Sequence, residues 1–390
     1  MSIRVHPWFL FFLLCISLTG YSASERFYIG TYTGPGKADG IYTGILDSDS
    51  GQLTVMMLAT KANNPGYLAL SPDRSHLYAV TSDNGGSVEA FAIAMIDPVP
   101  ISTVALEKPA LNSLNTVSSQ GAGPCYLSVD PSGKNVLVAN YSGGTIACIR
   151  INPDGTLLSS TSSIAFQGTG PNPARQDKPH AHFVSTDPTG QFVYACDLGT
   201  DHVWAYRFDP VAGAFGPPEP AQATVPPGSG PRHLAFSLNG DFAYVNGEMG
   251  RNITVFHRDK QTGSLTPIQT LPLVPGIAPA PDITTAEVVL HPSGKWLYVS
   301  SRGDDIIAVF AIGADGKLSF IQDVPALVKF PRGFGIDPTG RWLIAAGQND
   351  GKLAVLAIDP KTGKLTPTNN SANVPAAICV IFDGQPIVLN

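Results

Sequence analysis

Short apolar runs alternate with polar turns along most of this chain. In one clear case the apolar run Leu234–Phe236 is followed by the polar turn Ser237–Asp241 and then by a second apolar run, Phe242–Val245. Two short apolar runs joined by a turn are typical of a β-hairpin. No stretch of useful length shows the 3.6-residue periodicity of an amphipathic helix. The pattern therefore predicts an all-β fold.

The hairpin pattern recurs at a period of about 50 residues, which is typical of a β-propeller array. When the copies are aligned on the polar turn, the turn position falls at Arg74, Gly133, Gly190, Gly240, Gly294, Gly340 and Gly384. Seven copies predict a seven-bladed β-propeller, with glycine supplying a positive φ at most of the turns. A closed ring is one structural unit, so we expect a single domain despite the length of 390 residues.

The two ends of the chain each supply part of one blade. Phe27–Tyr32 matches the second strand of the repeat, and Ile41–Leu46 and Leu53–Leu58 follow as the third and fourth strands. The last copy, near Ala376–Phe382, provides only a first strand before the chain ends. We therefore expect the N-terminal strands to pair with the C-terminal strand, which closes the ring without an open edge.

The other six blades are expected between these closing strands. Their approximate ranges are 65–120, 124–177, 179–228, 231–280, 285–328 and 331–374. Three long connectors rich in proline or serine, Ile96–Gln120, Gln167–Lys178 and Leu271–Asp282, are expected to form loops over one face of the ring.

The N-terminal segment has a different character. Arg4 precedes the apolar run Trp8–Leu18, and small residues follow up to Ala23. This order is typical of a secretory signal peptide, and the apolar run is too short to span a bilayer. We therefore assign 1–23 as a signal peptide and 24–390 as the propeller domain. The protein is expected to be exported, either periplasmic or secreted, with no membrane association after cleavage.

Charge and composition narrow the expected partners. The net charge is −6 and the sequence has no basic cluster, which argues against a nucleic-acid partner. A closed ring leaves no exposed strand edge to pair with a second copy, so a monomer is expected.

Four cysteines remain after the predicted cleavage: Cys125, Cys148, Cys196 and Cys379. All four lie in apolar, strand-like runs, and none belongs to a CxxC pair. We expect buried free thiols that pack as small hydrophobic residues.

Ionisable residues gather at a few positions of the repeat. The first strand of each propeller blade lines the central channel, so equivalent positions should form rings around it. We compare two positions in the first strand and one at the end of the second strand, to which Glu248 and Arg302 belong. The ionisable members of these rings are His182, Arg232, His233, Glu248, Glu287, Arg302 and Arg332. Buried charges are costly unless they are paired or functional. The set therefore indicates either a ligand site, which we favour, or a salt-bridge network between blades.

The residue types suggest the chemistry of such a ligand site. Guanidinium groups match carboxylate or phosphate bidentately, and a glutamate with several histidines offers general acid–base catalysis. His180 and His182 alternate along a strand, so in a regular strand they should point to opposite faces. No carboxylate-rich shell accompanies them, and no Gly-x-Ser-x-Gly segment occurs. Neither a metal site, nor a cofactor, nor a serine hydrolase triad is expected.

At these residues the chain resembles the lactonase propeller family. The matching segments, in chain order, are Tyr28-Ile-Gly-Thr-Tyr-Thr, Val138-Ala-Asn-Tyr-Ser-Gly-Gly, Pro179-His-Ala-His, Gly230-Pro-Arg-His, Ala286-Glu, Ser301-Arg-Gly, Pro331-Arg-Gly-Phe and Ala345-Ala-Gly-Gln. The family includes bacterial 6-phosphogluconolactonases of the seven-bladed type, and related sequences include fungal 3-carboxy-cis,cis-muconate lactonizing enzymes. The ordered set is specific for the family but not for the substrate.

The resemblance implies a carboxylic ester hydrolase that opens a sugar lactone, typically 6-phosphoglucono-1,5-lactone. In this hypothesis Glu287 or His182 activates water for attack on the lactone carbonyl. Arg232 or Arg302 stabilises the resulting oxyanion. Arg332 holds the phosphate or carboxylate of an anionic substrate. The other expected substrate contacts are Tyr141, His180, His233, Glu248 and Gln348.

Two alternatives stay open. The other reaction of the family, on a muconolactone, also suits an arginine-rich site because its substrate is a polycarboxylate. An exported propeller that binds a ligand or a protein without catalysis shares the same geometry, because a fold does not determine a function. The predicted export bears on this choice, since a phosphorylated pentose-pathway lactone is a cytoplasmic metabolite. An exported chain therefore either meets a different lactone or has lost the activity.

Overall fold

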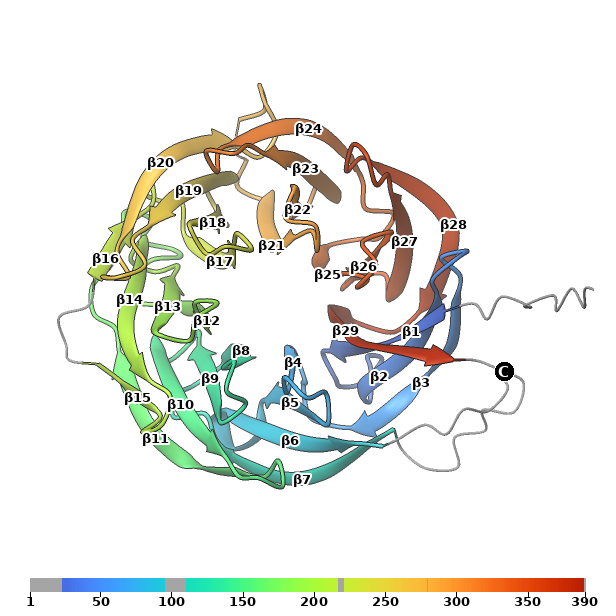
Figure 1. Ribbon diagram of the computed structural model, residues 1–390, viewed down its shortest axis with the longest axis horizontal. Helices are drawn as coiled ribbons and strands as arrows, with labels where there is room; N and C mark the ends of the chain where they lie inside the picture. The colour runs from blue at the N-terminus through green and yellow to red at the C-terminus, as the bar shows by residue number, and fades with distance from the viewer. Residues whose placement is uncertain (1–22, 95–109, 217–220, 279, 389–390) are drawn as a thin grey trace, which may run out of the picture.

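The strands of this protein form seven antiparallel sheets arranged as a ring. The computed structural model describes residues 23–94, 110–216, 221–278 and 280–388. Within them six of the seven sheets are built from strands that are neighbours in sequence, and the sheets stand around a central axis like the blades of a propeller (Figure 1). The prediction of an all-β, seven-bladed propeller is confirmed. The helical structure in these ranges is one 3-10 turn, η1 (Asp83–Gly85).

Six blades are continuous in sequence, and we number them 2 to 7. From the inner to the outer strand, blade 2 consists of β4 (Leu68–Leu70), β5 (His76–Thr81), β6 (Ser87–Ile93) and β7 (Leu111–Ser118), and blade 3 of β8 (Pro124–Val129), β9 (Asn135–Asn140), β10 (Thr145–Ile151) and β11 (Leu157–Ala165). In the same order, blade 4 consists of β12 (Ala181–Thr186), β13 (Phe192–Asp197), β14 (His202–Asp209) and β16 (Ala221–Thr224), with β15 (Ala214–Phe215) beside β14, and blade 5 of β17 (Pro231–Phe236), β18 (Phe242–Gly247), β19 (Asn252–Arg258) and β20 (Leu265–Pro272). Blade 6 consists of β21 (Thr284–Leu290), β22 (Trp296–Arg302), β23 (Ile306–Ile312) and β24 (Leu318–Pro325), and blade 7 of β25 (Pro331–Ile336), β26 (Trp342–Gly347), β27 (Lys352–Ile358) and β28 (Leu365–Asn373).

Blade 1 joins the two ends of the chain. Its inner strand is β29 (Ala377–Val388), followed outward by β1 (Ala23–Thr31), β2 (Gly40–Asp47) and β3 (Leu53–Lys61). β29 runs antiparallel to β1, with Phe27 opposite Phe382. The predicted closure is confirmed.

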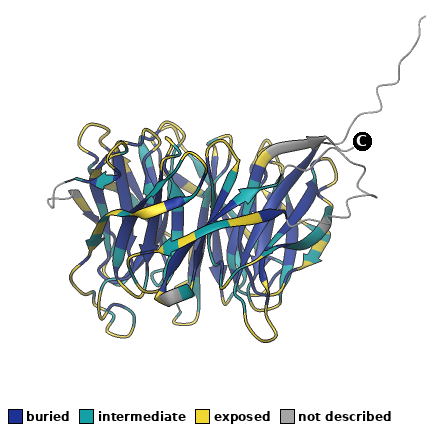
Figure 2. Cartoon of the chain, turned by 90° about the horizontal axis from the view of Figure 1, so that it is seen from below, coloured by how far each residue is buried: buried dark blue, intermediate teal, exposed yellow. Residues whose placement is uncertain are grey.

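The hydrophobic core lies between the blades. Each pair of adjacent blades encloses a buried apolar cluster; Tyr194 and Phe256, for example, share the cluster between blades 4 and 5. The Tyr194 hydroxyl also donates to Gly263 O of blade 5 at 2.7 Å. Figure 2 shows buried residues concentrated within the strands and exposed residues in the loops at the two faces. The blades therefore hold one another in a fixed ring, which fixes the positions of the inner strands.

The hairpin turns between first and second strands have the predicted backbone. Gly240 has a φ of 70°, and Arg74, at the equivalent turn of blade 2, has a φ of 61°. Both values lie in the left-handed region, which glycine adopts without steric cost. The turn alignment that revealed the repeat thus corresponds to a real backbone requirement.

The prediction for one connector was wrong. Leu111–Ser118, within the expected loop Ile96–Gln120, forms the outer strand β7. Its residues are mostly polar and partly exposed, because the outermost strand of a blade has a solvated face. An apolar run is therefore a poor signal for such a strand.

The described residues also bear on two other predictions. Their four cysteines are free thiols as predicted, with Cys148, Cys196 and Cys379 buried and Cys125 partly buried. The predicted signal peptide, 1–23, lies outside the described residues except for Ala23, the first residue of β1. It therefore stays a prediction. No helix in the described ranges is long and apolar enough to cross a membrane.

Candidate active site

The inner strands of blades 3 to 7 carry bulges where they reach one end of the central channel. At each bulge the ladder to the second strand skips one or two residues. The residues that the ladder skips are Cys125, His182, Arg232, His233, Ala286, Glu287 and Arg332. A bulge turns side chains away from strict alternation. Successive residues such as Arg232 and His233 can therefore both reach the channel.

A cavity of about 800 Å³ lies at this end of the channel. Eight of the predicted site residues line it: Tyr141, His182, Arg232, His233, Glu248, Glu287, Arg302 and Arg332. Strands of blades 3 to 7 thus bring together residues that are far apart in the sequence. The ring positions inferred from the repeat correspond to one real cavity.

Glu248, immediately after β18, is the centre of a charge cluster. Its Oε2 lies 3.1 Å from Arg232 Nε and 3.1 Å from Arg302 Nη2. Its Oε1 lies 2.7 Å from Arg175 Nη2. Burial alone would raise the pKa of the Glu248 carboxyl, but the three arginines together hold it well below its ordinary value. Glu248 is therefore ionised and neutralises part of the arginine charge.

Arg232 and Arg302 are both buried beside this carboxylate. Arg232 Nη1 donates to Ala286 O at 2.6 Å, and Arg302 Nη2 donates to Thr285 O at 2.8 Å. Burial, together with repulsion from neighbouring arginines, lowers the pKa of both guanidinium groups, that of Arg302 to about 10. Both therefore stay cationic near neutral pH. Arg302 Nε is buried without a hydrogen-bond partner in the described part of the chain.

Arg332, on β25, has no carboxylate partner among the described residues. Its guanidinium lies over the ring of Tyr32, 5.8 Å from the ring centroid, and its charge helps to lower the pKa values of Arg232 and Arg302. The lining of the cavity contains four arginines and one lysine, but its carboxylates are Glu248 and Glu287. This excess of positive charge favours an anionic ligand.

Glu287 and His233 form a hydrogen-bonded pair. His233 Nδ1 lies 2.7 Å from Glu287 Oε1, and Val288 N donates to the same oxygen at 3.2 Å. Burial lowers the pKa of His233 to about 4; Glu287 opposes this effect, and Arg232, whose Nη1 packs against the ring, adds to it. The imidazole is thus neutral and donates from Nδ1. Glu287 Oε2 makes no hydrogen bond to the described residues, which leaves it available to a molecule in the cavity.

His182 also presents a neutral imidazole to the cavity. Burial, followed by the positive charge of Arg232, lowers the pKa of His182 well below its ordinary value. The ring packs edge-to-face with His233 and Tyr141, and Nδ1 is buried without a partner among the described residues. Its ring nitrogens are therefore not committed to the protein.

His180 and Gln348 are not among the residues that line the cavity. The His180 ring stacks on Tyr141 with centroids 4.4 Å apart, and its Nδ1 lies 3.0 Å from Tyr141 O. The alternation expected of a regular strand does not apply here, because His180 precedes β12, the ladder skips His182, and both rings contact Tyr141. Gln348 Nε2 lies 3.5 Å from Asn349 Oδ1, at the limit of a hydrogen bond. We leave both residues out of the proposed substrate contacts.

Arg175 was missed by the sequence reasoning. It lies in the connector Gln167–Lys178, outside the repeat, so the alignment of equivalent positions could not select it. Nothing in the sequence distinguishes it from other loop cations, yet it lines the cavity and pairs with Glu248.

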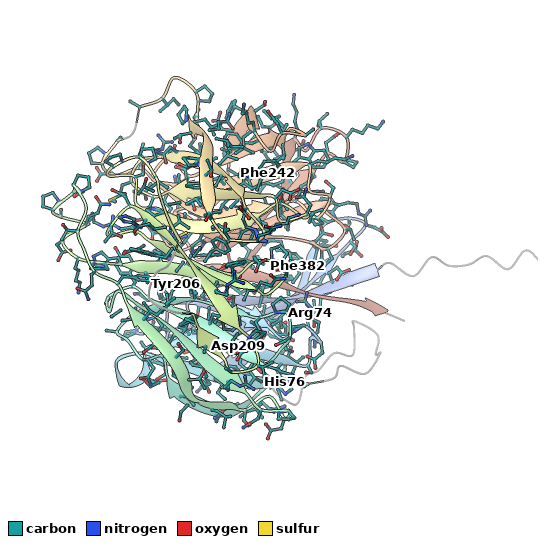
Figure 3. The ribbon with its side chains drawn as sticks, turned by 60° about the vertical axis from the view of Figure 1, so that its left-hand side comes forward. Arg74, His76, Tyr206, Asp209, Phe242 and Phe382 are labelled. Carbon is teal, nitrogen blue, oxygen red and sulfur yellow. The ribbon has the colours of Figure 1, made fainter. Side chains whose placement is uncertain are left out.

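A second cavity, of about 620 Å³, lies at the opposite end of the channel. Arg74 and Phe382, which Figure 3 labels, are among its lining residues. Tyr67, His233 and Glu287 line both cavities, so the carboxylate–imidazole pair belongs to the wall between them.

The arrangement is suited to hydrolytic chemistry. A carboxylate with one free oxygen can accept a proton from water, and adjacent guanidinium groups can stabilise an oxyanion. A purely structural salt-bridge network would account for Glu248 and its arginines, but not for the unpaired Arg332 or the free oxygen of Glu287. Among the described residues, no three His, Cys, Asp or Glu side chains converge to hold a metal ion.

The fold and the cavity define a seven-bladed propeller with a pocket rich in arginine at one end of its central channel. The chain belongs to the family described as "Lactonase, 7-bladed beta-propeller", whose model matches residues 26–382. The resemblance inferred from the short segments is thereby confirmed.

Relatives extend over nearly the whole chain. A 6-phosphogluconolactonase of Bacillus subtilis is 33% identical over 362 residues, which are 91% of this chain and 97% of the relative. A solved structure described as a periplasmic gluconolactonase of Pseudomonas aeruginosa is 31% identical, with a TM-score of 0.83 and coverage of 92% of this chain and 99% of that one. A solved protein from Lactobacillus plantarum is 34% identical with a TM-score of 0.83, covering 92% and 99%.

Proposed function

We propose that this protein hydrolyses a sugar lactone that carries an anionic group, as a 6-phosphogluconolactonase-like enzyme. The observation that carries the proposal is the Glu287–His233 pair, which has a free carboxylate oxygen beside a group of arginines with too few carboxylates to neutralise them. Two of the relatives are described as a 6-phosphogluconolactonase and a gluconolactonase, and these names support the same reaction class.

Glu287 is the proposed general base. His233 and Val288 N hold its Oε1, so Oε2 can accept a proton from a water molecule as that water attacks the lactone carbonyl. Collapse of the tetrahedral intermediate breaks the bond between the acyl carbon and the ring oxygen. The proton held by Glu287 passes to the departing oxygen, which gives the open-chain hydroxy acid and restores the carboxylate.

Arg232 is the better placed arginine to stabilise the oxyanion. It packs against His233 and its charge interacts with that of Glu287, so it lies near the proposed base. Arg302 is committed to Glu248 and Thr285 O and would act by holding Glu248 in place. A cation fixed in a water-poor site stabilises developing negative charge more than it would in bulk water.

Arg332 is the proposed partner of the anionic group of the substrate. Since it has no carboxylate partner among the described residues, binding an anion would relieve its repulsion with Arg232 and Arg302. His182 and Tyr141, which line the same cavity, would then hydrogen-bond to substrate hydroxyls.

Export is part of the proposal. The predicted signal peptide would place the enzyme outside the cytoplasm, and the Pseudomonas aeruginosa relative is described as periplasmic. A mature chain that begins near Ser24, measured by intact mass after expression with the native N-terminus, would support it. The expected monomer stays a prediction.

The test is lactone hydrolysis by the purified mature chain, followed by proton release. The panel is 6-phosphogluconolactone, unphosphorylated gluconolactone and a carboxymuconolactone, with an Arg332→Ala variant that still folds as the control. Hydrolysis of 6-phosphogluconolactone, impaired in the variant, supports the proposal. Hydrolysis of unphosphorylated gluconolactone alone would support a sugar lactonase but would contradict the anionic substrate. Hydrolysis of the muconolactone alone would favour the other family reaction. No hydrolysis by the folded chain would favour a binding propeller.

A further inference from the structure

The connector between blades 3 and 4 is an elaboration of the ring. It covers 166–180, whereas the equivalent crossovers between blades 2 and 3 and between blades 4 and 5 cover only 119–123 and 225–230. The crossover is at the same end of the ring as the cavity, because Arg175 from this loop lines it. The extra residues therefore add to the wall of the site.

The loop holds Arg175 in a defined position. Asn172 O accepts hydrogen bonds from Arg175 N at 3.1 Å and from Gln176 N at 2.7 Å, which closes a tight turn. The Gln176 side chain is fully buried; its Nε2 donates to Leu198 O at 2.9 Å and its Oε1 accepts from Asn172 N at 3.1 Å. The loop is thus anchored to blade 4 through the residue next to Arg175.

Arg175 differs from the other arginines of the cavity in its exposure. Its side chain is 40% exposed, whereas those of Arg232 and Arg302 are 3% and 5% exposed. One nitrogen, Nη2, makes both of its side-chain contacts, at 2.7 Å to Glu248 Oε1 and 3.3 Å to Tyr141 Oη. A guanidinium has five N–H groups. Nε and Nη1 of Arg175 therefore have no partner in the described part of the chain.

Glu248 does not depend on Arg175 for neutralisation, because Arg232 and Arg302 both contact its other oxygen. Arg175 thus brings to the rim of the cavity N–H groups that the described residues do not use, on a cation that shares its carboxylate partner with two other arginines. Such groups are suited to a ligand that carries negative charge away from the reacting centre.

We infer that Arg175 is a specificity-determining residue that binds an anionic substituent remote from the lactone carbonyl, a phosphate or a carboxylate. This inference rests on the proposed function, which puts the carbonyl beside Glu287. It names the substrate class as sugar lactones that are acidic at the far end of the molecule. Arg332 and Arg175 would then hold the anionic end from two sides of the cavity.

The test compares Arg175→Gln with the wild-type mature chain. Binding is measured calorimetrically for three open-chain acids: 6-phosphogluconate, glucarate and gluconate, which differ at the end remote from the product carboxylate. The matched control is Arg207→Gln, an exposed arginine of β14 in blade 4 that lies outside the cavity. Hydrolysis of the phosphorylated and neutral gluconolactones is measured in parallel.

The wild type is expected to prefer an acid with a charged remote end, and the preferred one of the two identifies phosphate or carboxylate. Arg175→Gln should reduce this preference by roughly 10- to 100-fold, the effect of one charge-assisted contact. Arg207→Gln should keep it. An unchanged preference in Arg175→Gln, or equal weakening of all three acids, would overturn the inference. Absence of lactone hydrolysis by the wild type would count against the proposed function alone, since the binding comparison stands without catalysis.

Discussion

Two buried arginine–carboxylate clusters in this ring show opposite designs. Arg258 and Asp187 join blades 4 and 5 at the turn end, where Arg258 Nη1 and Nη2 lie 3.0 and 2.8 Å from Asp187 Oδ2 and Nε donates to Gly240 O. Asp187 Oδ1 accepts hydrogen bonds from the backbone N–H groups of Gln191 and Phe192. Each of these polar atoms has a partner.

The cavity cluster around Glu248 is arranged differently. Three arginines share one carboxylate, a fourth has no carboxylate among the described residues, and Arg302 Nε and His182 Nδ1 are buried without partners. Buried polar groups in folded proteins are normally satisfied, so unsatisfied groups that gather in one place indicate that a ligand completes them. These two clusters thus differ in the satisfaction of their hydrogen bonds more than in burial or charge.

The largest expected effect is a loss of turnover when Glu287, the proposed general base in the cavity, is replaced. Glu287→Gln should lower kcat by roughly 100- to 10,000-fold, because the amide cannot accept a proton from water. The free energy of unfolding should change little, since the amide can still accept a hydrogen bond from His233. Steady-state kinetics and urea unfolding measure the two effects. Glu89→Gln, on β6 outside the cavity, is the control. Unchanged turnover would remove Glu287 as the base.

Disruption of the Arg258–Asp187 cluster should lower the stability of the protein rather than its activity. Arg258→Met leaves the Asp187 carboxylate buried without its ion-pair partner, which should lower the free energy of unfolding by about 3 to 5 kcal/mol. The folded fraction should keep its specific activity. Arg207→Met, at an exposed site, is the matched control. If Arg258→Met changes KM rather than stability, the distinction between the clusters is wrong.

Burial of the neutral His233 imidazole makes the stability of the protein depend on pH. The pKa of His233 is lowered to about 4, so between this value and the ordinary 6.5 the unfolded state binds more protons than the folded one. Stability should therefore fall as the pH drops from 6.5 towards 4, by roughly 3 kcal/mol for His233. The pKa of Glu248 is lowered too, so its contribution is lost only at more acidic pH.

Urea unfolding at several pH values measures this dependence. In His233→Gln the slope between pH 4 and 6.5 should be shallower by about one proton, or about 1.4 kcal/mol per pH unit. An equal slope in the variant would contradict a buried neutral imidazole.

The smallest expected effect concerns Arg332. Arg332→Gln should raise KM for an anionic lactone by roughly 10- to 100-fold, because a charge-assisted contact is lost. Its melting temperature should stay level or rise slightly, since no ion pair is broken and repulsion with Arg232 is relieved. Arg341→Gln, an exposed arginine of blade 7 beside Asp49, serves as control. A large loss of stability would show that Arg332 has a structural role.

The alignment of the repeats explains which site residues could be predicted from the sequence. Aligning the turns placed Glu248 and Arg302 at equivalent positions, and both line the cavity, because propeller blades are related by rotation about the channel. Strict alternation would have put Arg232 and His233 on opposite faces; the bulge in β17 is what brings both to the site. A bulge leaves no mark in a single sequence when both skipped residues are polar.

Other features lay beyond such an alignment. Arg175 comes from the extra length of a crossover that covers 166–180, whereas the equivalent crossovers on either side cover only 119–123 and 225–230, so no ring position could identify it. Gln348 illustrates the opposite error, since an equivalent position does not ensure that a side chain reaches the cavity. The pairing of His233 with Glu287 depends on the rotation between neighbouring blades, and that is a property of packing rather than of sequence.

The pairing of β29 with β1 has a consequence for how the protein is made. Contacts such as that between Arg26 and Asp383 join residues 357 positions apart, so they can form only after the chain has been synthesised as far as β29. Until then β1–β3 lack their inner neighbour, and the inner edge of β1 is left unpaired. Ring closure is therefore a late event in folding. A nascent chain interrupted shortly before its C-terminus would be a substrate for chaperones and proteases rather than a slightly shorter enzyme.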